Sequence, residues 1–104
     1  MANDPMTVKF TEANNSPAGK LADAELHFNE GPLAGLKLIG FAVWEGRTAG
    51  KRNVTFPARQ YSVNGERRSF SLLRPIEEAA AQDRIRDYIL EEYSRHEAQL
   101  ARTA

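Results

Sequence analysis

The first part of the chain carries two stretches in which apolar and polar residues alternate. Over residues 6–12, Val8 and Phe10 share one side, and over residues 21–30, Leu26 and Phe28 lie opposite Glu25 and His27. Alternation of this kind is typical of β-strands with one buried face. Because the intervening "ANNSPAGK" is rich in turn-forming residues, the pattern predicts a β-hairpin.

Residues 33–46, "LAGLKLIGFAVWEG", form the most apolar stretch. In a regular strand, one side would carry Leu36, Leu38, Ala42 and Trp44, and the other side Ile39, Phe41 and Val43. A strand that is apolar on both sides is either covered twice or lies in a contact between subunits. A chain of 104 residues has little material to cover a sheet twice. We therefore expect a dimer contact formed by Leu38, Ile39, Phe41, Val43 and Trp44.

Two further extended segments follow. Val54 and Phe56 alternate in "NVTF" before Pro57, and Asn64-Gly65 separates the extended segments of "YSVNGERRSFSLL". Asn-Gly between extended segments is the strongest short-range signal of a β-hairpin.

The apolar period then changes to that of a helix. In "RPIEEAAAQDRIRDYILEEYSRHEAQL", Pro75 is placed for a helix start, with two glutamates in the first turn. An apolar stripe follows at intervals of four residues, consisting of Ala81, Ile85, Ile89 and Tyr93, with Tyr88 beside it. The predicted fold class is α+β, with an antiparallel sheet of four or five strands followed by one long C-terminal helix.

The length and composition indicate one domain, over residues 6–98, with disordered ends at residues 1–5 and 99–104. The chain has no cysteine, which excludes disulfides and cysteine metal sites. It shows no signal-peptide pattern and no apolar run long enough to span a membrane. A cytoplasmic location without membrane association is the expectation.

Charge is distributed unevenly in a chain whose net charge is zero. Residues 47–74 hold seven bases and one acid, whereas the segments before and after them are each acidic. If the basic segment folds onto one side, it presents a positive surface to a polyanion. The candidate nucleic-acid-binding residues are Arg47, Lys51, Arg52, Arg59, Arg67, Arg68 and Arg74, together with Tyr61 as a platform for an unpaired base.

No pattern indicates catalysis. The sequence has no nucleophile elbow, no paired-histidine metal spacing and no phosphate-cradling glycine loop. We therefore expect no enzyme activity, no metal site, no cofactor and no small-molecule substrate.

The motifs "FPAR…NGERRSFSLLRPI…RIRDYILEEY", after "LKLIGFAVWEG", resemble the bacterial stage V sporulation protein G (SpoVG) family. The resemblance covers about residues 20–95 and matches Pro57, Arg59, Gly65, Glu66, Arg68, Pro75, Ile76 and Tyr93. The chain departs from the family at Phe56, Ala58, Ser69 and Arg74, and its interval from Gly65 to Pro75 is longer by two residues. The resemblance implies a homodimer built by strand pairing, and a regulator that binds DNA or RNA and influences gene expression, sporulation or septation.

Two other interpretations remain open for the basic segment. One is a protein-interaction module that meets an acidic partner. The other is a structural dimer without a nucleic-acid ligand, in which the basic residues form ordinary solvated surface and discourage edge-to-edge aggregation.

Overall fold

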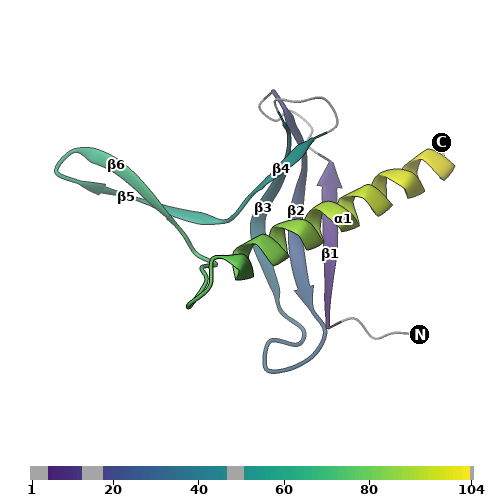
Figure 1. Cartoon of the computed structure of the whole chain (residues 1–104), viewed down its shortest axis with the longest axis horizontal. Coiled ribbons are helices and arrows are strands. Elements are labelled where there is room, and N and C mark those ends of the chain that lie inside the picture. Colours follow the sequence, from purple (N-terminus) through teal and green to yellow (C-terminus); the bar gives the residue numbers. More distant parts are fainter. Residues whose placement is uncertain (1–4, 13–17, 47–50, 104) are drawn as a thin grey trace.

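An antiparallel four-stranded sheet forms the centre of the protein (Figure 1). The computed structural model describes residues 5–12, 18–46 and 51–103 of the chain. The sheet has the strand order β1-β2-β3-β4. Its strands are β1 (Met6–Glu12), β2 (Lys20–Phe28), β3 (Lys37–Glu45) and β4 (Arg52–Thr55). The predicted hairpin at the start of the chain is confirmed by the antiparallel pairing of β1 with β2.

One long helix, α1 (Ala80–Thr103), crosses one face of this sheet (Figure 1). Ile89 and Tyr93 of the helix are buried together with Leu26 of β2 and with Phe41 and Val43 of β3. These side chains belong to one apolar cluster, which also includes Ala22, Ala24 and Val54. The α+β class and the helical stripe at Ile85, Ile89 and Tyr93 are therefore confirmed.

A bulge in β3 changes which side chains share a face. Leu26 pairs with Leu38, but Ala24, two residues earlier in β2, pairs with Phe41, three residues later in β3. The additional residue breaks the strict alternation, so that Leu38, Phe41 and Val43 all pack with the core under the helix. Ile39 is left 61% exposed.

The burial of Phe41 and Val43 removes these two residues from the expected dimer contact. Phe41 and Val43 are only 1% and 0% exposed, because the chain's own helix covers them, and they offer no surface to a partner. Leu38 is half-buried against the core. Trp44 is also half-buried, and its indole N–H donates to Thr55 Oγ1 at 2.8 Å. Of the five side chains, Ile39 is the one that is exposed.

A second sheet stands apart from the first. Strands β5 (Ala58–Val63) and β6 (Glu66–Ser71), among the residues that the structure describes, pair only with each other. They form a hairpin, here called the arm, that projects from the end of β4 (Figure 1). The Cα radius of gyration, 15.4 Å, exceeds the roughly 13 Å of a compact chain of this length, as a projecting arm requires. The expected single sheet of four or five strands is thus two sheets, of four and two strands.

Backbone conformation explains the tip and the root of the arm. At the tip, Asn64 and Gly65 have φ values of 51° and 81°, as a two-residue hairpin turn demands, so the predicted Asn-Gly hairpin is confirmed. At the root, a Cβ on Gly40 would lie 2.8 Å from Cβ of the buried Pro57. The N–H of Leu72 donates to the Pro57 carbonyl at 2.8 Å and closes the base.

The helix begins and ends later than the sequence predicts. It begins at Ala80 instead of Pro75, because the residues just after Pro75 do not reach the core; Ile76 is 97% exposed. It continues to Thr103, past the expected end at residue 98, because Ala, Gln, Leu and Arg are good helix formers even without burial. Residues 1–4 of the N-terminal segment that the sequence predicts to be disordered lie outside the described residues.

Candidate nucleic-acid interface

The two strands of the arm place their side chains on two different faces. The register pairs Arg59 with Phe70, Tyr61 with Arg68, and Val63 with Glu66. Directly opposed residues project to the same side of a ribbon, so these six form one face, here called the aromatic face. The opposite face, called the polar face, consists of Ala58, Gln60, Ser62, Arg67, Ser69 and Ser71.

Aromatic and cationic side chains alternate on the aromatic face. Tyr61 and Phe70 lie on one diagonal, with ring centroids 5.6 Å apart and ring planes inclined by 59°. Arg59 and Arg68 occupy the other diagonal. Such a surface offers π-faces for stacking and guanidinium groups for phosphate oxygens within the same small area.

The arm is exposed along its length. Tyr61 and Phe70 are 41% and 40% exposed. The three arginines of the arm are also exposed: Arg59, Arg67 and Arg68. Arg68 forms a 3.2 Å ion pair with Glu66, but both side chains remain mostly in solvent. Exposed pairs of this kind contribute little energy, so this contact leaves Arg68 able to meet a phosphate.

Arg52 lies elsewhere and has a partner of its own. Its guanidinium binds both carboxylate oxygens of Glu97 on α1, one of them at 2.9 Å, and lies 5.1 Å from the centre of the Tyr93 ring. The hydrogen bonds to Glu97 raise the pKa of Arg52 above its already high usual value. The structure therefore assigns Arg52 to the docking of α1 on β4.

The other basic candidates do not join the aromatic face. Lys51 is exposed just before β4. Residues 52–57 lie between Lys51 and the arm, and they span roughly 20 Å when extended. Arg74 is exposed in the connection between β6 and α1, beside a hollow that Glu77, Glu78 and Arg84 also line. Arg47 lies outside the described residues. The arm therefore brings together Arg59, Tyr61, Arg67 and Arg68.

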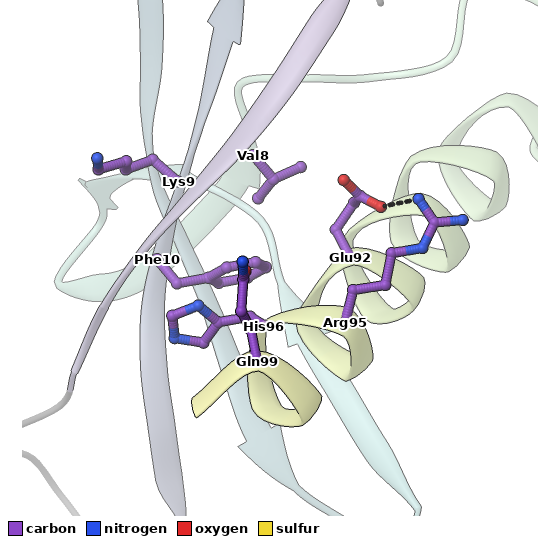
Figure 2. Close-up of a pocket in the computed structure, with 7 residues that line it drawn as sticks. All are labelled: Val8, Lys9, Phe10, Glu92, Arg95, His96 and Gln99. Carbon is purple, nitrogen blue, oxygen red and sulfur yellow. Dashed lines mark hydrogen bonds and ion pairs between the residues drawn. The ribbon is translucent and has the colours of Figure 1, made fainter. Parts of the chain in front are cut away.

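A separate groove runs between β1 and α1 (Figure 2). Val8 and Phe10 line the side of the groove that β1 forms, and the volume of the groove is about 500 Å³. Phe10 contacts His96 with ring centroids 5.2 Å apart, and Arg95 is bound by Glu91 and Glu92 at 3.0 and 2.9 Å. The acidic Glu91 and Glu92 balance the basic Lys9 and Arg95 there, so the groove offers a polyanion less net positive charge than the arm, which has three arginines and one glutamate.

Phe70 is the residue of this interface that sequence reasoning missed. The signal was present, because a two-residue Asn64-Gly65 turn sets Val63 opposite Glu66 and hence Arg59 opposite Phe70. Counting outward from the turn places Phe70 beside Tyr61.

In the parts of the chain that the structure describes, no cluster of three or more His, Asp or Glu side chains is arranged to hold a metal ion. Within the same residues, α1 lacks the apolar character that a membrane-spanning helix needs. No protein-family model, curated protein or solved structure matches the chain.

Proposed function

We propose that the protein binds nucleic acid through the β5–β6 arm. The observation that carries the proposal is the set of three exposed arginines, Arg59, Arg67 and Arg68, on a projecting ribbon that has only one acidic residue, Glu66. Most of the affinity of such interfaces comes from contacts between basic side chains and phosphates, because these contacts release counterions that had condensed on the nucleic acid. The chain's zero net charge does not oppose this, since binding responds to the local potential.

The shape of the arm suits an extended polyanion. A two-stranded ribbon is narrow enough to follow a phosphate backbone or to enter the major groove of a duplex. Arginines on both of its faces, with Arg67 on the polar face and Arg59 and Arg68 on the aromatic face, allow contacts with more than one phosphate. A role in gene expression, sporulation or septation rests on the SpoVG resemblance alone.

Affinity for oligonucleotides should fall steeply as salt rises. Three neutralised phosphates give log–log slopes of about −2 on single strands and about −3 on duplex. Between 50 and 200 mM salt, single-strand affinity should thus fall about twentyfold. Fluorescence anisotropy with labelled DNA and RNA oligonucleotides measures both quantities. The variant Glu91→Ala/Glu92→Ala removes two acidic residues of α1, the exposed Glu91 and the half-buried Glu92, and should bind as tightly as the wild type or slightly more tightly.

The proposal would be contradicted if the protein did not bind oligonucleotides even at 50 mM salt, or if its affinity did not change between 50 and 200 mM. The exposed arginines would then fit the alternative function, a module that binds an acidic protein partner. If the protein bound neither nucleic acid nor an acidic protein partner, only a structural role would remain for the arm's arginines.

The arm also supports a proposal about assembly. In the described part of the chain, β5 and β6 each have one edge without a partner, and a two-stranded sheet is marginally stable alone. Pairing of one edge from each arm of two copies would form a four-stranded sheet, satisfy one open edge per arm and double the basic surface. Light scattering at micromolar concentration should then report about twice the 11.6 kDa chain mass. A monomer at every concentration would exclude the homodimer.

A further inference from the structure

We propose that the aromatic face of the arm binds single-stranded nucleic acid, with unpaired bases stacked on Tyr61 and Phe70. This inference rests on the proposed function and adds the ligand class and the residues that select it. Among the described residues, Tyr61 and Phe70 are the exposed aromatic side chains. Every other Phe, Tyr and Trp that the structure describes is buried or half-buried.

In the part of the chain that the structure describes, no packing beneath the arm covers the two exposed rings. The six residues of β5 are all exposed, as are all residues of β6 except the half-buried Ser71. The rings therefore contribute little to a core, and their contact with one another, at 5.6 Å, covers only part of each. Aromatic residues in that position are suited to stacking on a planar ligand, because every nucleobase presents a π-face.

The two neighbouring arginines argue for a nucleic acid over a neutral planar ligand. Arg59 precedes Tyr61 by two residues on the same face, at about 7 Å along the strand, and Arg68 lies directly opposite Tyr61. A base on Tyr61 or Phe70 would thus have a guanidinium within reach of its own phosphate. The polar face has one arginine, Arg67, and no ring, so it can contribute charge but no stacking.

The aromatic face can stack only on bases whose π-faces are accessible, and this requirement distinguishes single strands from duplexes. In a duplex each base is already stacked on its neighbours, and its π-face is closed to a protein ring. Single strands expose those faces, and stacking on an aromatic side chain contributes about 1–3 kcal/mol per base. The aromatic face should therefore prefer unpaired bases over duplex, with little dependence on base identity.

The test compares four probes of equal length by fluorescence anisotropy: a thymidine DNA strand, a uridine RNA strand, a duplex, and an abasic strand that keeps the phosphates. Each stacked base should make the wild type bind the base-bearing single strands about fivefold to a hundredfold more tightly than the abasic strand. Phe70→Leu should lose the contribution of the base that stacks on Phe70, about fivefold to a hundredfold of that preference, and should leave both abasic affinity and the salt slope unchanged. Phe70→Trp should restore the preference, and Gln60→Leu on the polar face should not alter it.

The outcomes separate this inference from the proposed function. Equal wild-type affinity for base-bearing and abasic strands would overturn stacking and keep phosphate binding, and this comparison requires no variant. Light scattering could instead show that Phe70→Leu halves the mass of the particle while the preference for base-bearing over abasic strands is unchanged. That result would mean that a second copy covers the aromatic face, and it would also overturn the stacking inference. Failure to bind any probe would refute the proposed function itself.

Discussion

Replacement of Ile89 by alanine should lower the free energy of unfolding by about 2–5 kcal/mol, the usual cost of emptying a buried aliphatic site. Ile89 is 0% exposed and belongs to the cluster that joins α1 to the sheet. A domain of this size has only about 5–15 kcal/mol of stability, so the change is a large fraction of the total. Urea unfolding followed by circular dichroism measures the difference.

The matched control lies two residues earlier on the same helix. Asp87 is exposed, and Asp87→Ala should change the free energy of unfolding by less than about 0.5 kcal/mol. Arg86 is less suitable as a control, because it pairs with Asp83 at 2.6 Å and lies 5.6 Å from the centre of the Phe56 ring. Equal losses at Ile89 and Asp87 would mean that α1 does not dock on the sheet through this stripe.

Local signals in the sequence predict those parts of the fold that short-range chemistry determines. The alternation at Val8 and Phe10 and the Asn64-Gly65 turn each specify their hairpin without help from distant residues. The turn even sets the register of the arm, and with it the composition of both faces. The interval of four residues at Ile85, Ile89 and Tyr93 similarly identifies the buried side of α1.

Distant contacts determine what the sequence pattern did not predict. The bulge near Gly40 shifts Phe41 and Val43 into the core, and it occurs where Gly40 closely approaches Pro57, seventeen positions along the chain. Strict alternation assumes a regular strand, so the predicted membership of the two faces was wrong: Leu38 lies with Phe41 and Val43 on the core side, and Ile39 does not. The separation of β5 and β6 from the main sheet also has no local signature.

Arg52 shows the same limit for electrostatics. A sum of charges over residues 47–74 counts Arg52 as a free cation, whereas the fold gives it Glu97, forty-five positions away. Both side chains lose part of their hydration where they meet beside Tyr93, and their hydrogen bonds join β4 to α1. A local charge excess thus indicates where a basic surface can form but does not show which of its members stay free.

That distinction gives the prediction with the largest expected effect on binding. The triple variant Arg59→Gln/Arg67→Gln/Arg68→Gln removes every arginine of the arm and keeps polar side chains of similar length. At 50 mM salt each phosphate contact contributes about a tenfold gain in affinity, so the variant should bind single strands and duplex about a thousandfold more weakly. Its salt slope should approach zero, because few counterions remain to be released.

The matched control is Arg52→Gln, which removes one of the candidate bases but not one on the arm. Because Arg52 is paired with Glu97 and lies against Tyr93, this change should lower the midpoint of thermal unfolding and leave the salt slope of binding as it is in the wild type. The triple arm variant should show the reverse, with a lost slope and a nearly unchanged midpoint, since exposed side chains contribute little to stability. If Arg52→Gln flattens the slope as much as one arm substitution does, then phosphate contacts extend along β4, and the arm is only part of the interface.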